Sequence, residues 1–442
     1  MYILAGYNTL AEKYNELVHK INDSEVLRQL ANTLDGNLQT FAIHPNQINR
    51  LTNTSSFKNY SNNVSKYISD LNVLANEFKK LVYIDSGGYQ ISIGDIKQEK
   101  FRQMLDAYAM FLDEHQHVYD RAFSLDMLPQ TLEIPYDELL RLNQLGLYDH
   151  KPQLKKKLLK IFHFITPGCV SLYEKIFFNN STIVDGHEKW SVGGLVAFDR
   201  SDGKLFTFPY ALAFSHIYNL YKERYGKNAP LYSVEFHVLG VSSHVDVLLC
   251  KFLERASELL TNIKLTVTHD SSRVFKGVIR GKSIQYFNTK TFELVEVSYK
   301  SGDLDLPNQT LKMTNREALL YAFKEICGKE FDFSQIYENE KDPTSKPTSH
   351  KEVLIAMIDV AQFKKMKKIL DRIFSNVKTY DELVSVTAQI FSYMTKSNSS
   401  KYNTNKLRFV ERCFNSNIVE SRNMLRVMFQ GVNRLSYLHS TN

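Results

Sequence analysis

Several residue types are scarce in this chain of 442 residues, and each scarcity excludes a class of protein. Four cysteines, none within four residues of another, are too few for a disulfide scaffold and form no compact zinc cluster. Eighteen glycines and ten prolines exclude collagen-like and low-complexity chains. The sequence contains no apolar run of about 18 residues and no signal-peptide pattern at its start. We therefore expect a cytoplasmic protein that does not contact a membrane.

The charge is unevenly distributed along the chain. The net charge is +7, with 43% hydrophobic and 23% charged residues, which is typical of a globular protein. Residues 341–442 hold 17 Lys and Arg against 8 Asp and Glu, so this segment carries +9 and the remainder −2. Such an asymmetry indicates either contact with a polyanion or a solvated lysine-rich helix face.

From residue 81 onward, short apolar or β-branched runs alternate with helical patterns. The runs lie at 81–84, 122–125, 161–165, 190–192, 234–239 and 265–269, and each ends at a polar or glycine residue. This spacing fits a strand, a helix and two loops, which predicts parallel strands joined by helical crossovers. The pattern favours an α/β fold of the (β/α)8 TIM-barrel type, completed by N-terminal or later strands; a doubly wound open sheet is the alternative.

The sequence divides into four parts around this pattern. Residues 1–80 show helical spacing over 10–21 and 64–81, and we expect them to pack on the barrel or to complete it. Residues 81–337 would form the barrel with insertions. The Pro-, Ser- and Thr-containing stretch 338–350 is expected to be a linker, and 351–442 to be a basic helical C-terminal module.

Three aspartates follow predicted strands, where a (β/α)8 barrel carries its catalytic groups. Asp85, Asp126 and Asp270 could together supply a nucleophile, a proton carrier and a hydrogen-bond acceptor. Each one alone is more often a turn or N-cap residue. Glycine pairs at 87–88 and 193–194 also stand at strand ends, where the backbone can approach a ligand or simply turn.

In order and spacing, these motifs resemble the tRNA-guanine transglycosylase superfamily. The elements are Asp-Ser-Gly-Gly-Tyr-Gln at 85–90, an Asp some forty residues later, Val-Gly-Gly-Leu at 192–195, Leu-Gly-Val at 239–241 and Asp270. The resemblance covers roughly residues 81–282. It implies a TIM barrel that exchanges a flipped-out guanine for a 7-deazaguanine through a covalent glycosyl-aspartate, with retention of configuration.

The resemblance also assigns roles by position. Asp270 matches the nucleophile, Asp85 the proton-transfer group, and Asp126 the reader of the N1–H and amino group of the base. Tyr89 matches the aromatic residue that stacks on the base. The other matching base-pocket positions are Ser86, Gly88, Gly193, Gly194, Leu195, Leu239 and Gly240.

Two departures from the family pattern bear on the substrate. Thr166-Pro167-Gly168 stands where the family commonly has Gln-Gly, so one contact to the base is lost. The cysteines and histidine of the family's zinc subdomain have no counterpart after Asp270, so we expect no zinc and no other cofactor. Because that subdomain helps to hold tRNA, its absence favours DNA, as in the DNA-guanine transglycosylases of phages and bacterial modification islands.

Two basic groups are candidates for phosphate contacts, although either could be an ordinary solvated face. They are Arg273, Lys276, Arg280 and Lys282 after the predicted nucleophile, and Lys364, Lys365, Lys367 and Lys368 in the C-terminal segment. The expected partners are DNA and a free 7-deazaguanine base, in the host cytoplasm if the protein is phage-encoded. A tRNA-guanine transglycosylase with a replaced zinc module and a non-catalytic nucleic-acid-binding subunit are the alternatives; the sequence leaves the oligomeric state open.

Overall fold

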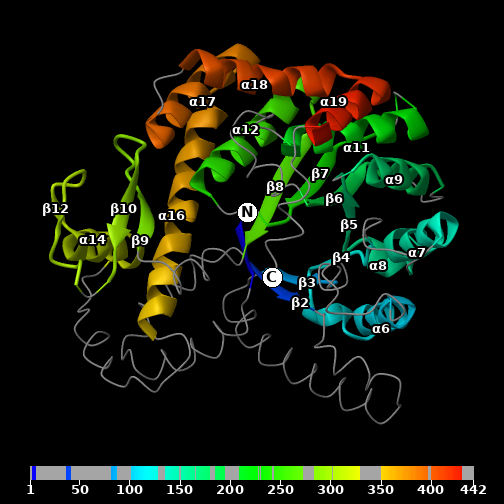
Figure 1. The fold of residues 1–442 in the computed structure, drawn as a ribbon, viewed down its shortest axis with the longest axis horizontal. Helices are drawn as coiled ribbons and strands as arrows, with labels where there is room; N and C mark the ends of the chain where they lie inside the picture. The colour runs from blue at the N-terminus through cyan, green and yellow to red at the C-terminus, as the bar shows by residue number, and fades with distance from the viewer. Residues whose placement is uncertain are drawn as a thin grey trace, which may run out of the picture.

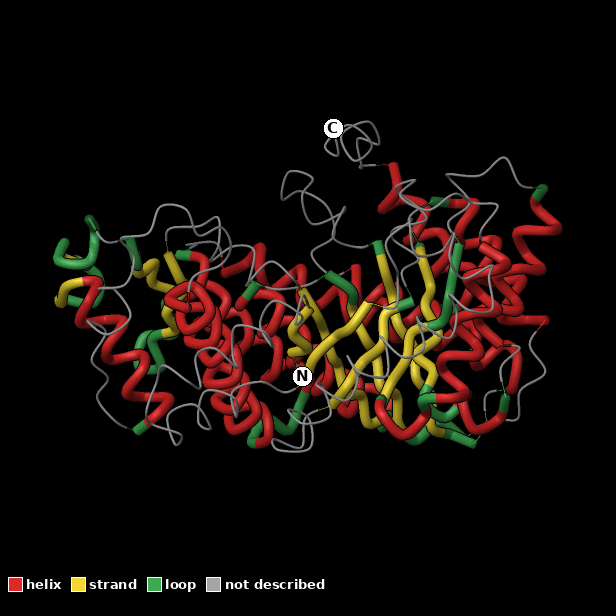
Figure 2. Tube along the Cα trace, turned by 90° about the horizontal axis from the view of Figure 1, so that it is seen from below, coloured by secondary structure: helices red, strands yellow, loops and turns green. Residues whose placement is uncertain are grey.

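The protein has a mixed α/β fold in which parallel strands lie at the centre and helices lie outside them (Figures 1 and 2). It is described here from a computed structural model. The structure describes residues 2–5, 36–40, 81–86, 101–127, 135–148, 151–164, 166–179, 185–194, 209–226, 228, 230–240, 243–271, 283–300, 302–328, 350–396 and 400–430.

In these residues, eight strands pair in parallel in the order of the sequence. They are β1 (Tyr2–Ala5), β2 (Gly36–Thr40), β3 (Leu81–Asp85), β4 (Arg121–Phe123), β5 (Leu158–His163), β6 (His187–Gly193), β7 (Ser233–Val238) and β8 (Lys264–Ser271). The sheet is curled, because β1 pairs with both β2 and β8, and Ile3 lies opposite both Gly36 and Asp270. The predicted α/β fold with parallel strands is confirmed, and the sheet curls as the barrel interpretation requires. All C-terminal strand ends share one edge, hereafter the rim.

Helices follow five of these strands. They are α6 (Phe101–Glu114) after β3, α7 (Tyr136–Tyr148) and α8 (Pro152–Lys155) after β4, α9 (Pro167–Asn179) after β5, α11 (Pro209–Tyr225) after β6 and α12 (His244–Thr261) after β7. The segments that follow β1 and β2 lie outside the described residues, so the full set of eight strand–helix units stays a prediction. The helices expected over 10–21 and 64–81 also lie outside them, except that Leu81 begins β3.

Alternate residues of the strands face two separate apolar cores. Val82 and Ile84 belong to the large core between the sheet and its helices. Tyr83 between them belongs to a small inner core with Phe123, Leu159 and Ile161, against which Leu81 and Leu239 pack. Because side chains alternate along a strand, this inner face carries Asp85 two residues after Tyr83 and His163 two residues after Ile161.

Side chains also span the inside of the curled sheet. The Tyr83 hydroxyl on β3 donates a hydrogen bond of 3.0 Å to Glu235 on β7. Arg121 on β4 forms an ion pair of 2.7 Å with the same glutamate. Burial and this glutamate raise the pKa of Tyr83 far above its usual value, so the hydroxyl keeps its proton and remains a donor. These contacts between β3, β4 and β7 close the inner face below the rim.

A small α/β subdomain follows β8. It contains the antiparallel pair β9 (Ser283–Phe287) and β10 (Leu294–Ser298), the short pair β11 (Pro307–Asn308) and β12 (Met313–Thr314), and α14 (Asn315–Cys327). Residues 338–349 of the predicted linker lie outside the described residues, and His350 begins the next helix.

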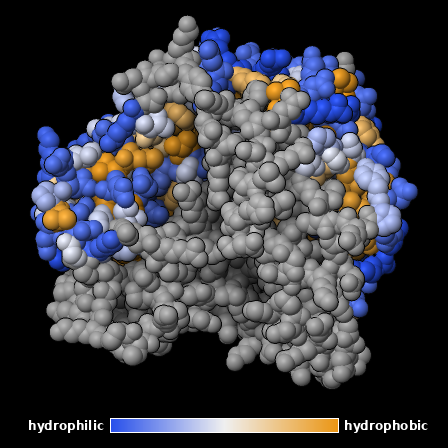
Figure 3. Space-filling view, in the orientation of Figure 1, coloured by the Kyte–Doolittle hydropathy of each residue, from blue (hydrophilic) through white to orange (hydrophobic). Residues whose placement is uncertain are grey.

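Four C-terminal helices wrap around one side of the sheet and its helices (Figure 1). They are α16 (His350–Ser375), α17 (Tyr380–Thr395), α18 (Ser400–Asn415) and α19 (Ile418–Gln430). Leu354, Leu407 and Leu425 lie in the same apolar core as the residues of α11 and α12. At the upper edge of the view, where α18 and α19 lie, the visible surface is mostly hydrophilic with a few apolar patches (Figure 3). This segment is therefore packed on the α/β sheet unit as an amphipathic layer.

Polar contacts between the helices add to that packing. Glu174 on α9 pairs with Arg422 on α19 at 2.7 Å and lies 3.1 Å from His216 on α11. Lys251 on α12 pairs with Asp371 on α16 at 2.5 Å. In the described residues, no helix is long and apolar enough to cross a membrane.

Candidate functional site at the rim

Two of the three candidate aspartates are buried at the rim, and each is bonded to a histidine of a neighbouring strand. Asp126 follows β4 and has 3% of its surface exposed; Asp270 lies near the end of β8 with 7% exposed. The histidine partners are His163 on β5 and His237 on β7. The rim therefore holds two aspartate–histidine pairs, here called the Asp126 pair and the Asp270 pair.

In the Asp270 pair, every donor converges on one carboxylate oxygen. His237 Nε2 and the backbone N–H of Gly240 each lie 3.1 Å from Asp270 Oδ1. Gly240 has a φ of +79°, a left-handed conformation that favours glycine, and this turn directs its N–H at the carboxylate. In the described part of the chain, Oδ2 accepts no hydrogen bond. Asp270 is thus held by one oxygen, and the described residues leave the other without a hydrogen bond.

The imidazole of this pair is also held at its far side. His237 Nδ1 lies 2.8 Å from Thr268 Oγ1. Because the carboxylate only accepts, we assign the imidazole proton to Nε2, and the Thr268 hydroxyl then donates to Nδ1. The His237 ring also packs edge-on against Phe123, with centroids 4.8 Å apart, and lies 5.8 Å from the Tyr83 ring. His237 is therefore fixed by contacts from β3, β4 and β8.

In the Asp126 pair, the occupied oxygen is Oδ2. His163 Nε2 lies 2.5 Å from it and the Tyr173 hydroxyl of α9 lies 3.3 Å from it. Burial and the nearby Asp126 raise the pKa of Tyr173 well above its usual value, so this hydroxyl donates. Oδ1 accepts no hydrogen bond from the described residues. The role that the resemblance gives Asp126, accepting two N–H groups of a base, thus falls on a carboxylate with one free oxygen.

Gly193 makes room for the His163 ring. The two residues are register partners on β5 and β6, and a Cβ on Gly193 would lie 2.4 Å from His163 Cε1 and 2.9 Å from Nδ1. Such distances are far below van der Waals contact, so a side chain at 193 would displace the ring from Asp126. The next residue, Gly194, has a φ of +76° and begins the turn away from the strand.

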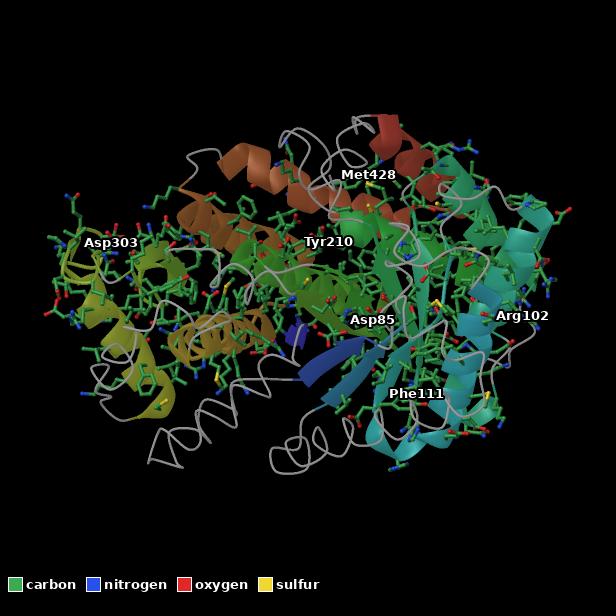
Figure 4. All side chains as sticks on the ribbon, turned by 60° about the horizontal axis from the view of Figure 1, so that its bottom comes forward. Asp85, Arg102, Phe111, Tyr210, Asp303 and Met428 are labelled. Carbon is green, nitrogen blue, oxygen red and sulfur yellow. The ribbon has the colours of Figure 1, made fainter. Side chains whose placement is uncertain are left out.

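The other candidates from the resemblance lie as follows. Asp85 is half-buried at the end of β3, on the same rim (Figure 4), and Ser86 beside it is 1% exposed. Leu239 follows β7 and packs on the inner core. Gly88, Tyr89 and Leu195 lie outside the described residues, as do Arg273, Lys276, Arg280 and Lys282.

The C-terminal lysine cluster is only partly a free basic face. On α16, Lys368 is exposed, whereas Lys364, Lys365 and Lys367 are half-buried. Lys365 pairs with Glu325 of α14 at 2.5 Å and lies over the Tyr286 ring at 4.7 Å. The sequence makes Lys365 a candidate for phosphate contact; in the structure its amino group joins α16 to the subdomain, because a carboxylate and a ring of that subdomain face it.

Sequence reasoning missed His163 and His237. A signal existed, because each is a polar residue at an inner position of an otherwise apolar run, two residues from Ile161 and Leu239 respectively. In the described residues, no group of three or more His, Cys, Asp or Glu could hold a metal ion. Comparisons with family models, curated proteins and solved structures found no match for this chain.

Proposed function

We propose that the chain is a (β/α)8 base-exchange transglycosylase that replaces guanine in DNA with a 7-deazaguanine derivative. The observation that carries the proposal is the Asp270 carboxylate, buried at the rim with Oδ1 held by His237 and Gly240 and Oδ2 unoccupied by the described residues. Orientation of one oxygen in this way suits a carboxylate nucleophile.

The strand registers support the barrel part of the proposal. The register of the strand pairs can be followed once around the sheet, from β3 through β8 and then through β1 and β2 back to β3. The path returns to β3 eight residues before the residue at which it began. An offset of eight residues around eight strands is the geometry of a (β/α)8 barrel. In such a barrel, residues at the C-terminal ends of several strands supply the chemistry, which is where Asp85, Asp126 and Asp270 stand.

The proposed reaction has two displacements at C1′ of the nucleotide. Asp270 Oδ2 attacks C1′, the bond from C1′ to N9 breaks, and guanine leaves with the electron pair and a proton from Asp85. The incoming base then loses its proton to Asp85 and attacks C1′, and the ester bond to Asp270 breaks. Two inversions give retention of configuration, as in retaining glycosidases. The role of Asp85 rests on the resemblance.

The choice of DNA rests on charge. Residues 341–442 carry +9, and the exposed cations of α16 to α19 include Lys368, Arg372, Arg412 and Arg426. Phosphate contacts of this kind give affinity that falls steeply with salt and carries little sequence information.

Because α16–α19 share the core of α11 and α12, removal of 341–442 would expose that core. Charge reversal at exposed positions is the cleaner test of this segment.

The test is incorporation of labelled guanine into duplex DNA, single-stranded DNA or bulk tRNA by the full chain. We expect label in DNA and a covalent DNA–protein adduct. Asp270→Ala should remove the adduct and lower exchange by at least about 10³-fold in a protein that still folds, although its thermal midpoint falls because His237 and Gly240 lose their acceptor. Asp381→Ala on the exposed face of α17 is the control. Near wild-type exchange by Asp270→Ala would refute the assignment, and label in tRNA alone would move it to the tRNA enzyme.

A further inference from the structure

A line of polar side chains runs through the inside of the curled sheet, from the Asp270 pair toward the end of the strands opposite the rim. His237 is bonded to Asp270 through Nε2, and its Nδ1 lies 2.8 Å from Thr268 Oγ1. Burial raises the pKa of Tyr83, and a hydrogen bond from the Thr268 hydroxyl acts against this rise. The Tyr83 hydroxyl in turn lies 3.0 Å from Glu235 Oε1. These contacts join side chains of β3, β7 and β8 into one hydrogen-bonded line.

The two ends of this line differ in their access to solvent. His237, Thr268 and Tyr83 are all fully buried. The Glu235 side chain keeps 15% of its surface exposed, and that of its ion-pair partner Arg121, the first residue of β4, keeps 27%. The line therefore reaches solvent near the end of the strands opposite the rim.

The hydrogen bonds of this line can run in either direction. Each hydroxyl donates one proton and can accept another. With Glu235 ionised, Tyr83 donates to it, Thr268 donates to Tyr83, and a second proton on the imidazole, at Nδ1, is donated to Thr268. With Glu235 protonated and the imidazole neutral, all three bonds are reversed. The two arrangements contain the same number of protons and differ only in which end of the line carries the added one.

We propose that this line is a proton relay, in which Thr268 and Tyr83 carry a proton between the imidazole at the rim and Glu235 near the opposite end of the strands. In the outward direction, the Nδ1–H bond of His237 breaks as the Thr268 oxygen takes its proton. Thr268 gives its own proton to Tyr83, and Tyr83 gives its own to Glu235. The imidazolium becomes imidazole and the carboxylate becomes a carboxylic acid, while both hydroxyl groups stay neutral.

Charged groups at the two ends set the direction of transfer. At the rim, the Asp270 carboxylate favours a proton on His237. At the other end, Arg121 pairs with Glu235 at 2.7 Å, and Lys189 on β6 is the register partner of Glu235. Because these two cations favour an ionised Glu235, a proton in the relay is held at the rim while Asp270 is ionised.

The use of the relay in base exchange rests on the proposed function. When Asp270 forms the ester with C1′, it loses its negative charge, and an imidazolium beside it loses its counter-ion. The proton then moves through the relay to Glu235, and it returns when the ester bond breaks and the carboxylate is restored. A polymer seated on the rim would shield His237 from water on that side, whereas the relay opens at the other.

The test is the rate at which His237 gains and loses the proton on Nδ1, measured from the NMR line shapes of isotope-labelled histidine in the full chain. Tyr83→Phe removes one hydroxyl from the line and keeps the ring in the inner core. Near the midpoint of the His237 titration, it should slow this proton exchange by at least about tenfold. Under the proposed function, kcat for base exchange should also fall, with KM for the free base nearly unchanged.

Tyr108→Phe is the matched control. Tyr108 is as deeply buried as Tyr83, but its hydroxyl donates to the Phe123 carbonyl at 2.7 Å, outside the line. Both variants lose a buried hydrogen bond and should lower stability, whereas Tyr108→Phe should leave the proton exchange of His237 unchanged. If Tyr83→Phe does not fold, Thr268→Val and Thr268→Ser decide the matter, because the valine should slow the proton exchange and the serine should preserve it.

The outcomes separate this inference from the proposed function. Unchanged proton exchange in Tyr83→Phe, or in Thr268→Val, would overturn the relay and mean that His237 exchanges its proton at the rim; base exchange by the wild-type chain would then stand without it. Proton exchange that slows in these variants, in a chain that exchanges no base, would support the relay and remove the transglycosylase activity.

Discussion

The Asp126 pair and the Asp270 pair differ at the far nitrogen of the imidazole. His237 Nδ1 is hydrogen-bonded to Thr268, so that a continuous hydrogen-bond chain runs from Thr268 through His237 to Asp270. No described residue bonds to His163 Nδ1, so the corresponding hydrogen-bond chain at Asp126 is incomplete there. A complete chain fixes a carboxylate for chemistry, whereas an open one leaves hydrogen-bonding capacity for a ligand. Under the proposed function, this difference suits the Asp270 pair to positioning and the Asp126 pair to recognition.

Stability alone would favour a complete hydrogen-bond chain at both aspartate–histidine pairs. An unsatisfied buried acceptor costs about 1–3 kcal/mol, and a hydroxyl on a neighbouring strand would remove that cost, as Thr268 does for His237. Functional sites are where such local penalties persist. Gly193 supports a functional interpretation of this pair, because it leaves space for the His163 ring that an apolar side chain would otherwise fill.

The largest expected effect comes from closing the space at His163. Gly193→Ala would place a Cβ 2.4 Å from His163 Cε1 and force the ring off Asp126. We expect guanine binding to weaken by about 10- to 100-fold and the free energy of unfolding to fall by about 1–3 kcal/mol. Equilibrium dialysis and thermal unfolding measure the two effects.

The control for this substitution is Gly302→Ala, because a Cβ at 302 would meet no atom within 4 Å. It should change neither affinity nor stability by more than a few tenths of a kcal/mol. An alanine at 193 that bound guanine as tightly as the wild type would mean that the position of the His163 ring does not matter for the base.

The next largest effect comes from removing the Thr268 hydroxyl, which completes the hydrogen-bond chain of the Asp270 pair. Thr268→Val removes the hydroxyl bonded to His237 Nδ1 while nearly keeping the volume of the side chain. If His237 positions Asp270, kcat for exchange should fall about tenfold with little change in KM for the free base, and Thr268→Ser should restore it. A lower thermal midpoint with unchanged kcat would instead give Thr268 a purely structural role.

The fold could be predicted as far as its local patterns reach. The runs from residue 81 onward indicate β3 to β8, because each run is apolar or β-branched and ends at a polar or glycine residue. The strands β1 and β2 were not located. Tyr2–Ala5 is a four-residue run, and Gly36–Thr40 reads Gly-Asn-Leu-Gln-Thr with one apolar residue. Their pairing with β3 and β8 is a tertiary contact that the local sequence does not specify.

The candidate site shows the same limit. Asp85, Asp126 and Asp270 could be picked out because each follows a strand, and parallel strands share one rim. The bond from His163 to Asp126 joins residues of different strands, so its existence depends on register and on Gly193, which no local pattern reveals. The basic tail shows a related limit: a count of charges does not reveal that Lys365 faces Glu325 across a helix interface.

The smallest expected effect concerns a second unpartnered group, the Ser191 hydroxyl. Ser191 lies on β6 two residues before Gly193, opposite Ile161 and His237; it is fully buried, and its hydroxyl makes no hydrogen bond with the residues that the structure describes. Removing an unpaired hydroxyl relieves a desolvation cost, so Ser191→Ala should leave stability unchanged or raise it by up to about 1 kcal/mol. If the hydroxyl contacts the base, guanine affinity falls about threefold at the same time.

The control is Ser215→Ala, which breaks a satisfied buried hydrogen bond to the Leu212 carbonyl on α11. It should do the reverse, lowering stability while leaving affinity unchanged. Unchanged affinity in Ser191→Ala would confine recognition to the Asp126 pair, and lowered stability would show that the hydroxyl has a partner after all.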